Sequence, residues 1–482
     1  MQEPNLCNPP NLYNPIIYKY TNMSKNEKLV SGPIICFRLE GQVNNVNKTI
    51  YLFGDVHENI SIQSTCPSWK SDDFVRYFSQ TMKKTDKQTQ YDFFFEIGKK
   101  MWTTEIDKKE RYIEEVQKYF GSTLNIIDES SEKTGSTNST NSTNSTNLTN
   151  STNSTNSTNL TDLIDLNTDK PKKPIRVNKG STEEVNLRLH HVDIRELFRN
   201  ESIVANILQE MDSIIKNIST YLDATNYVLQ EMENKIKIFK IHLFSETFLF
   251  LDYLIKTNEI VANDTNDTND PNDLLTVKKI LNKNFNDLNY MSNKIKNVYH
   301  DENVKKILLN DSHIINQMKT FRKNIFEYCD KILLDIKKLV DYWDNGHRML
   351  SKYDNHCDYN LPYVGKIENT LPILKDWSKI NYLNTYMYAD IMDLYALRRM
   401  LDKNYIKNVI VYTGAYHTTN YLLTLVKYFD FKVTHCTSNE YTIDELHDMI
   451  NKSTETEELF CKCMPKKFYQ CIDMANFPDN FL

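Results

Sequence analysis

Two histidines that lie far apart in the chain stand in the same local pattern. His57 ends the stretch YLFGDVH and His417 ends VIVYTGAYH, and each follows an apolar run and a glycine three residues earlier. We expect this glycine to allow a tight turn that brings the imidazole back over the edge of a sheet. Imidazole can take a proton from water or an alcohol, and it can bind zinc, manganese or iron. The two histidines are therefore candidates for one site.

Other polar residues lie where predicted strands end, which is the edge at which open α/β sheets bind ligands. Carboxylates there can share a metal with histidine or hold a water as general base, and arginine can bind an oxyanion through two hydrogen bonds. Each of these side chains can equally be structural, as a hydrogen-bonded cap or an ordinary salt bridge. The candidates are Asp55 and Glu58 beside His57, Glu96 after DFFF, and His191, Asp193 and Arg195 on one face of HHVDIRE.

The elements that must position these residues can be recognised from hydrophobic periodicity. Short β-branched or aromatic runs predict strands in GPIICFRLEG, KTIYLFGDVHE, YDFFFEIGKK, NLRLHHVDIRE and KNVIVYTGAYH. Helical patterns lie between them, and continuous apolar runs suit strands that are covered on both faces. The sequence thus predicts an α/β fold whose core is a mainly parallel sheet.

Two insertions are expected to split this core. A Ser/Thr/Asn repeat has almost nothing apolar to bury and predicts disorder, while apolar residues at i, i+3, i+4 and i+7 predict packed helices. The predicted organisation is 1–129 as the first half of the core, 130–182 as a low-complexity disordered insert, 183–200 as a core strand, 201–345 as a helical insertion with a disordered loop at 263–273, 346–450 as the second half of the core, and 451–482 as a C-terminal tail.

Composition excludes some classes of function. The 482 residues contain 58 Lys plus Arg against 64 Asp plus Glu, a formal charge of -6, so we expect no nucleic-acid partner. We predict no membrane partner, because charged residues interrupt the most apolar helical stretch. There is no Walker loop, Gly-x-Ser-x-Gly elbow or strand-linked Gly-x-Gly-x-x-Gly, which disfavours nucleotide-dependent chemistry.

The cysteines and the N-terminal residues indicate the cell compartment in which we expect the protein. The nine cysteines are odd in number and widely scattered, which favours a reducing compartment over a disulfide framework. Cys461, Cys463 and Cys471 could bind a soft metal, although scattered thiols explain them as well. The first thirty residues show no charged segment followed by an apolar one, so we expect a cytoplasmic protein.

At its strand ends the sequence resembles the erythromycin esterase, ChaN-like and TraB/Tiki superfamily, whose members carry two distant Gly-x-x-His motifs and a strand-end glutamate after the first. GDVH (54–57), FFFE with Glu96, and GAYH (414–417) match in that order. The resemblance implies that His57 and His417 are paired ligands or acid/base groups and that Glu96 is their partner. It also implies an arginine in a helix before the second motif, for which Arg398, Arg399 and Arg195 are candidates. Activities in that superfamily include macrolide ester hydrolysis, metal-dependent peptide cleavage and haem binding.

The composition carries a second resemblance. Asn/Ser/Thr tracts and an excess of Asn, Lys, Ile and Tyr look like the proteins of large DNA viruses with AT-rich genomes. For a viral protein, the predicted location is the host cytoplasm or the virion.

Two functional hypotheses follow. In the first, the protein is an esterase- or peptidase-like hydrolase of a small molecule or peptide, in which His57, Glu96 and His417 activate water directly or through a divalent ion such as Mn, Zn or Fe. Asp55, Glu58, Asp193 and Arg195 are further catalytic candidates. In the second, the protein is a non-catalytic α/β scaffold whose helical insertion binds another protein.

Overall fold

The computed structural model describes most of the α/β core and much of the helical region. The described residues are 28–57, 66, 71–86, 88–96, 113, 116, 175–178, 184–194, 203–221, 226–243, 295, 299–353, 367–437, 441–463 and 470–481.

A seven-stranded sheet forms the centre of the molecule, in the order β6-β7-β5-β8-β3-β2-β9. The four central strands, β7, β5, β8 and β3, run parallel to one another. β6 pairs antiparallel with β7, β2 pairs antiparallel with β3, and β9 pairs antiparallel with β2. This confirms the predicted α/β class with a parallel core. The bounds are β2 (Ile35–Val43), β3 (Val46–Asp55), β5 (Tyr91–Phe95), β6 (Ile175–Asn178), β7 (Glu184–His191), β8 (Asn408–Gly414) and β9 (Lys432–Cys436).

Both faces of the sheet are buried, as the continuous apolar strands predict. Along β3, Ile50 and Leu52 belong to the large core under the helices, while Tyr51 and Phe53 belong to a second, aromatic-rich core. The first core is covered by α11 (Ala415–Phe429), α12 (Ile443–Lys452) and α13 (Thr456–Cys463), and the second by α1 (Phe74–Lys83) and the C-terminal residues.

A small three-stranded sheet joins the two ends of the described chain. β1 (Leu29–Ser31) lies between β10 (Cys471–Asp473) and β4 (Ser71–Asp73), antiparallel to the first and parallel to the second. The predicted C-terminal tail is therefore part of the folded core.

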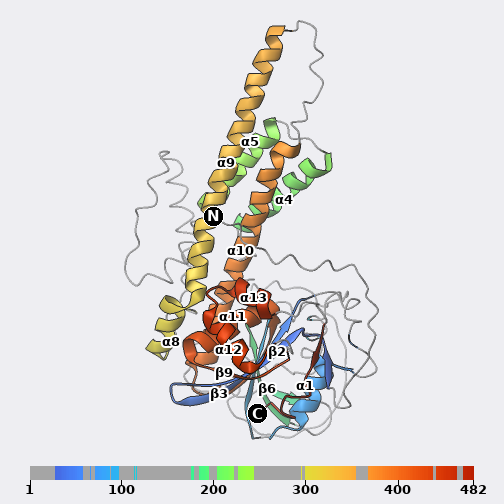
Figure 1. Ribbon diagram of the computed structural model, residues 1–482, viewed down its shortest axis with the longest axis vertical. Helices are drawn as coiled ribbons and strands as arrows, with labels where there is room; N and C mark the ends of the chain where they lie inside the picture. The colour runs from blue at the N-terminus through green and yellow to red at the C-terminus, as the bar shows by residue number, and fades with distance from the viewer. Residues whose placement is uncertain are drawn as a thin grey trace, which may run out of the picture.

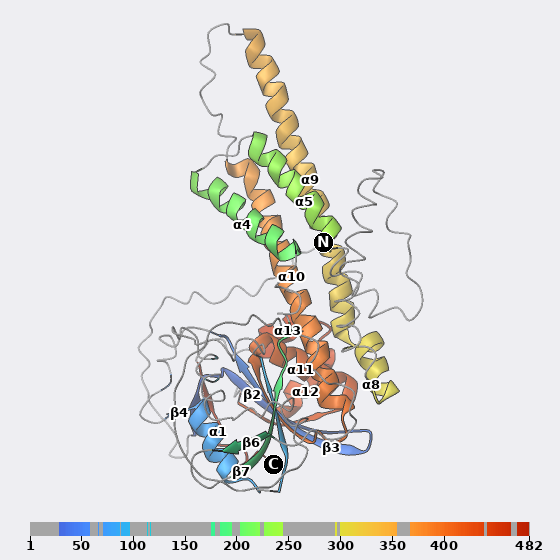
Figure 2. The same ribbon diagram turned by 180° about the vertical axis from the view of Figure 1, so that it is seen from behind.

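Long helices extend away from the sheet. Figures 1 and 2 show α9 and α10 leaving the core side by side, with α4 and α5 packed against them further out. The bounds are α4 (Ile203–Tyr221), α5 (Asn226–Leu243), α8 (Glu302–Lys306), the π-helix η7 (Ile307–Asp311), α9 (His313–Tyr353) and α10 (Ile367–Asp402). Within the described residues, no helix combines the length and apolarity that a membrane crossing requires.

Some predicted segments lie partly or wholly outside the described residues. In the predicted insert 130–182, residues 175–178 form β6, at the edge of the sheet, and the rest is not described. The predicted loop 263–273 is also outside the described residues. The predicted domain boundaries stay predictions.

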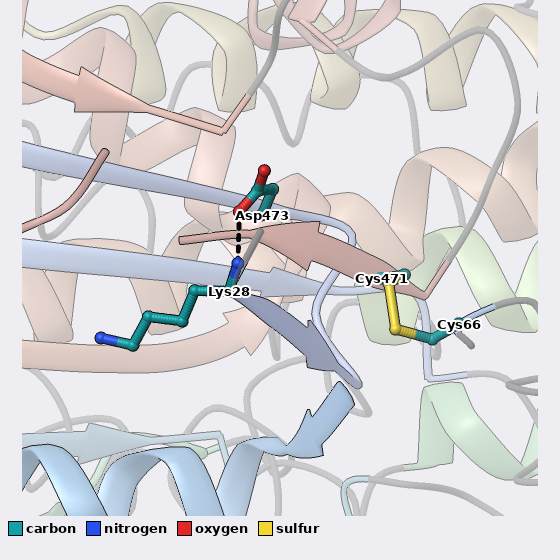
Figure 3. Close-up of a disulfide and its surroundings, with 4 residues drawn as sticks. All are labelled: Lys28, Cys66, Cys471 and Asp473. Carbon is teal, nitrogen blue, oxygen red and sulfur yellow. Dashed lines mark hydrogen bonds between the residues drawn. A yellow bond between two sulfur atoms is a disulfide. The ribbon is translucent and has the colours of Figure 1, made fainter. Parts of the chain in front are cut away.

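The expectation about cysteines is wrong. Cys66 and Cys471 form a disulfide across 405 positions of sequence (Figure 3), and Cys461 is disulfide-bonded as well. Cys463 remains a buried thiol. Spacing could not reveal these pairs, because the fold of β10 onto β1 is what brings Cys471 to Cys66. The scattered cysteines therefore give no support to a reducing compartment, and a soft-metal site made of three C-terminal thiolates is not formed.

Candidate active site at the carboxyl edge of the sheet

The two histidines and the strand-end glutamate meet around one carboxylate. Glu96 lies just past β5, and its Oε2 is 3.2 Å from Nε2 of His57 while its Oε1 is 3.2 Å from Nε2 of His417. The backbone N–H of Gly414 also donates to Oε2, at 2.5 Å. Three donors from two distant places in the sequence thus converge on one side chain that is 4% exposed.

Strand order explains this convergence. β8 lies between β5 and β3, all three are parallel, and Asp55 at the end of β3 pairs with Gly414 at the end of β8. The residues that follow these strands therefore emerge at the same edge of the sheet. His57 follows β3, Glu96 follows β5, and His417 lies in the first turn of α11.

The two glycines of the repeated motif do not make the predicted tight turns. Gly54 and Gly414 lie within strands, and both are needed for close packing instead. A Cβ on Gly414 would lie 3.1 Å from Nε2 of His57 and 3.3 Å from Oε2 of Glu96, and one on Gly54 would lie 2.9 Å from a methyl of Ile35. Only a residue without a side chain fits at position 414, because the side chains of His57 and Glu96 lie so close to it.

The unusual backbone conformation belongs to His57 itself, whose φ is 54°. A residue with a side chain adopts this left-handed region at some cost, so surrounding contacts must hold it there. Oδ1 of Asp55 accepts the backbone N–H of His57 at 3.1 Å, and Oδ2 lies 3.5 Å from its Nδ1. Tyr412 donates its hydroxyl to Oδ2 at 3.2 Å. Asp55 therefore orients both the backbone and the ring of His57.

A third carboxylate joins the cluster from the helical layer. Asp393 of α10 lies 2.7 Å from Nδ1 of His417 through its Oδ1, and its Oδ2 accepts from Asn420 at 2.6 Å. Sequence patterns did not point to Asp393. Its signal was the pair Asp390 and Asp393 in the otherwise apolar stretch 387–397 of α10, because buried carboxylates require polar partners.

Asn420 connects this cluster to a second buried group of polar residues. Its amide donates to Asp390 at 3.1 Å as well as to Asp393, and its oxygen accepts from Thr456 at 2.6 Å and from Nε2 of His313 at 2.5 Å. The amide is thus fully hydrogen-bonded, which fixes the position of both carboxylates.

Gln317 supports Asp390 from α9. Its amide donates to both oxygens of Asp390, at 3.2 and 3.1 Å, and to the hydroxyl of Tyr416 at 2.5 Å. The buried Asp390 carboxylate therefore has hydrogen-bond donors from both α9 and α11, as burial requires.

Charge pairing sets the protonation of the cluster. Burial lowers the pKa of His417, but the Asp393 and Glu96 carboxylates outweigh this and raise it to about 10. Burial likewise lowers the pKa of His57, and Glu96 together with Asp55 raises it to about 9. Burial alone would raise the pKa of Glu96, yet the two imidazoles hold it well below its usual range. At neutral pH the cluster is a carboxylate between two imidazolium rings.

Burial dominates the titration of the groups behind it. Burial, reinforced by the nearby Asp393, raises the pKa of Asp390 well above its usual range. Burial lowers the pKa of His313 to about 4, which leaves a neutral ring that donates through Nε2 to Asn420.

The arginines suggested by the resemblance lie elsewhere. Arg399 donates to Nδ1 of His190 at 2.9 Å, and Nε2 of His190 is 2.7 Å from Asp92. Asp92 is near the start of β5, four residues before Glu96, or about 13 Å along a strand. Arg398 lies over the rings of Tyr299 and Tyr395. Both arginines therefore have other partners in the described part of the chain.

The other predicted site residues can be placed only in part. Asp193 is described and half-buried just past β7, which neighbours β5. His191 ends β7 and is half-buried too. Glu58 and Arg195 lie outside the described residues. In the described part of the chain, Glu96 is paired with histidine.

The predicted metal fits this arrangement poorly. Imidazole and carboxylate are suitable donors, but His417 has both ring nitrogens on carboxylates, and a ring charged up to about pH 10 offers no lone pair to a cation. Among the described residues, no group of three or more His, Cys, Asp or Glu is arranged to hold a metal ion. The metal stays a prediction, and no step below uses it.

Comparison with known proteins places the chain in a family. A family of unknown function (DUF5847) matches residues 28–142 and 166–482, and the gap between them covers most of the Ser/Thr/Asn repeat. The chain is similar to Uncharacterized protein R706 of Acanthamoeba polyphaga mimivirus, with 30% identity covering 95% of this chain and 98% of that protein. It is also similar to Uncharacterized protein R161 of the same virus, with 28% identity covering 96% and 100%.

These relatives support the viral part of the sequence analysis. Their printed names carry no esterase or peptidase activity, so the resemblance to the erythromycin esterase superfamily stays a prediction. No solved structure matches the chain. Because the family match covers most of the chain, including the strands and helices that build the cluster, the chain belongs to the family of unknown function DUF5847.

Proposed function

We propose that the protein is a hydrolase in which His57 activates water for attack on an ester or amide carbonyl. The observation that carries this proposal is the shared carboxylate: Glu96 binds two imidazoles that come from sequence motifs 360 residues apart. A buried carboxylate that orients a histidine holds the imidazole in the position from which it can take a proton from the nucleophile.

His57 is the member of the cluster that a substrate can reach. Its side chain is 26% exposed, against 4% for Glu96 and 6% for His417. Its Nε2 donates to Glu96, while its Nδ1 is buried and faces Oδ2 of Asp55 at 3.5 Å, without a hydrogen bond in the described part of the chain. In the proposed reaction the ring turns Nδ1 away from Asp55 to receive the proton from water.

The reaction can be written with the residues that are present. In the neutral His57 ring, Nδ1 takes a proton from water while the water oxygen forms a bond to the carbonyl carbon. The same proton then passes to the leaving alcohol or amine as its bond to the carbonyl carbon breaks. Glu96 stabilises the imidazolium that exists between these two steps.

His417 acts through Glu96. Its ring is a fixed cation between Glu96 and Asp393, so it keeps Glu96 ionised and holds its oxygens in place. Asp393 holds His417 in the orientation that points Nε2 at Glu96. His417 and Asp393 are thus positioning residues for the base.

The test is a hydrolysis assay with a panel of p-nitrophenyl esters and fluorogenic peptides. The variants are His57→Ala and Glu96→Gln, with His447→Ala as the matched control, because His447 accepts the backbone N–H of Val433 on β9. We expect kcat to fall roughly a hundredfold or more in the two cluster variants and to stay within a factor of about two in the control. Wild-type rates in His57→Ala would refute the assignment, as would a wild-type protein that is inert on the whole panel.

The same proteins should be assayed for bound metal. Stoichiometric metal in the wild type that is lost in His57→Ala would replace direct activation of water by a metal-assisted mechanism. Metal content that does not differ between them would leave the direct mechanism in place.

The described helices give the scaffold hypothesis little support. Among the described residues, the large apolar side chains that are exposed are Tyr227 and Ile238 on α5 and Leu334 on α9. Scattered single residues of this kind are normal on a protein surface, whereas a docking face needs a contiguous patch. Catalysis at the sheet edge is therefore the function we favour.

A further inference from the structure

Within the described residues, Asp55 is the side chain that accepts the backbone N–H of His57, so whatever fixes Asp55 also helps to fix the proposed base. Asp55 is 1% exposed and accepts from Tyr412 on its own sheet. A further contact comes from the opposite end of the chain. Nε2 of Gln470 donates to Oδ1 of Asp55 at 3.3 Å, the same oxygen that accepts the backbone N–H of His57.

Gln470 is itself well fixed. It is 3% exposed, and its backbone carbonyl accepts the N–H of Gly32 at 3.1 Å. It directly precedes β10, which pairs with β1 over three residues, and Asp473 of β10 accepts the backbone N–H of Lys28 at 3.1 Å (Figure 3). The amide therefore approaches Asp55 from a strand that belongs to the folded core.

The disulfide ties the same strand to the other side of His57. Cys471 follows Gln470 directly and is bonded to Cys66, which is nine residues after His57 (Figure 3). Asp55 lies two residues before His57. Asp55, before the base, is hydrogen-bonded to Gln470, and Cys66, after the base, is disulfide-bonded to Cys471. Gln470 and Cys471 are adjacent in the chain, so both sides of His57 are connected to the same short segment.

We propose that Gln470 is a positioning residue for His57 and that the Cys66–Cys471 disulfide keeps Gln470 in place. Gln470 acts through Asp55 and touches neither water nor substrate. Its catalytic consequence rests on the proposed function, but its effect on the conformation of His57 does not.

Reduction of the disulfide should therefore weaken the site. A dithiol such as dithiothreitol gives two electrons and two protons to the cysteine sulfurs, which become two thiols, and is itself oxidised to a cyclic disulfide. The strand keeps its pairing with β1, so the fold should persist. The segment after His57 is no longer anchored to Cys471, and Asp55 loses part of the support of Gln470.

The first experiment compares Gln470→Met, which keeps the volume but removes the donor, with Gln42→Met as control. Gln42 donates to Asn47 on the exposed hairpin between β2 and β3 and is remote from the cluster. The readout is an NMR titration of the histidine rings, assigned with His57→Ala and His417→Ala. Thermal unfolding and circular dichroism show whether each variant is folded.

We expect the pKa of His57 to move from about 9 toward its ordinary value near 6.5 in Gln470→Met, because Asp55 is one of the groups that raise it. His417, which does not contact Asp55, should keep its pKa, and the control should change neither. Where hydrolysis is measurable, kcat should fall roughly tenfold to a hundredfold with little change in KM. A folded Gln470→Met protein with an unchanged His57 titration would overturn the proposal.

The second experiment tests the disulfide. The wild type and the double variant Cys66→Ala/Cys471→Ala are each measured before and after dithiothreitol, because Cys461 is also disulfide-bonded and must be controlled for. We expect dithiothreitol to shift the His57 titration in the wild type and to leave the double variant, already shifted, unchanged. Equal responses in both proteins would assign the effect to another disulfide and refute the role of Cys66–Cys471.

These readouts separate the two claims. If the wild type hydrolyses nothing but Gln470→Met shifts the pKa of His57, the positioning role stands and the hydrolase proposal fails. If the wild type is active and its titration is the same in Gln470→Met, the hydrolase proposal stands and the positioning role fails.

Discussion

A single carboxylate decides the charge state of the residues around it. Glu96 accepts from His57, His417 and Gly414, and burial leaves it no water to replace them. The two rings keep Glu96 ionised and Glu96 keeps the rings protonated. Residue types alone could suggest this group, but mutual stabilisation of charge depends on distance, which sequence does not contain.

Replacing Asp393 should show whether His417 must be a charged, oriented ring. Asp393→Asn keeps the shape but removes the charge, so His417 should lose a proton more easily and rotate away from Glu96. We expect kcat to fall roughly a hundredfold or more with KM nearly unchanged, measured by steady-state hydrolysis.

Asp390→Asn is the matched control for that prediction. Asp390 lies on the same helix but accepts from Gln317 and Asn420, not from His417, so an amide should replace it with a smaller effect on the His417 ring. Equal losses in the two variants would mean that packing of α10, and not the charge on Asp393, supports the site.

Raising the pH should increase the activity and decrease the stability of the protein. The proposed base must be neutral, so kcat/KM should rise about tenfold per pH unit from pH 7 and level off near the His57 pKa of about 9. A rate that falls across this range would identify His57 as an acid instead.

Stability should fall over the same range. The folded pKa values of His57 and His417 lie above the unfolded value near 6.5, so their contribution is complete below pH 6.5 and is lost as the pH rises through about 9 to 10. Urea unfolding at pH 6 and pH 10 measures this change. The His417→Ala variant should show a smaller decrease, and a wild-type free energy of unfolding that is constant across the range would contradict the assignment.

At the scale of elements, the site depends on three adjacent parallel strands that end at one level. The strands and their polar ends could be predicted, because apolar runs followed by Gly, His or Glu are local patterns. The contribution of α10 could not be predicted, because its sequence is that of an ordinary helix. Only the packing of α11 against α10 gives its two aspartates their partners.

Gly414→Ala tests the close approach of β8 to the cluster. The new methyl would lie 3.1 Å from Nε2 of His57 and 3.3 Å from Oε2 of Glu96, so the residues must separate. We expect a loss of about 1–3 kcal/mol in the free energy of unfolding and a strong loss of activity per folded molecule.

Val411→Ala is a suitable control on the same strand. Its side chain packs into the core under the helices, so the variant should lose stability without disturbing the cluster. If activity per folded molecule falls as much in Val411→Ala as in Gly414→Ala, the glycine has no special role at the site.

At the scale of the whole molecule, the helices that extend from the sheet should be separable from the proposed active site at the sheet edge. Trp377 of α10 is buried and donates its indole N–H to Asp212 of α4 at 2.9 Å, and Asn381 donates to the same oxygen at 2.8 Å. These contacts fasten α4 to α10 well before the turn that carries Asp393.

Asp212→Ala should therefore loosen α4 and leave hydrolysis unchanged. Loss of the acceptor leaves a buried indole N–H without a partner, at a cost of about 1 kcal/mol. Hydrogen exchange should be faster in α4, with Asp335→Ala on α9 as a control, since Asp335 makes an exposed pair with Lys338. A large loss of kcat in Asp212→Ala would show that the outer helices take part in the site.

The sequence by itself determined the α/β class, the buried strands and the identity of His57, Glu96 and His417, because hydrophobic period and strand-end chemistry are properties of neighbouring residues. Tertiary structure decided which contacts these residues make. It placed three strand ends side by side, brought Asp393 to His417, and joined Cys66 to Cys471 across 405 positions. Those contacts depend on the order of strands in the sheet and on the packing of helices, and no local pattern records either.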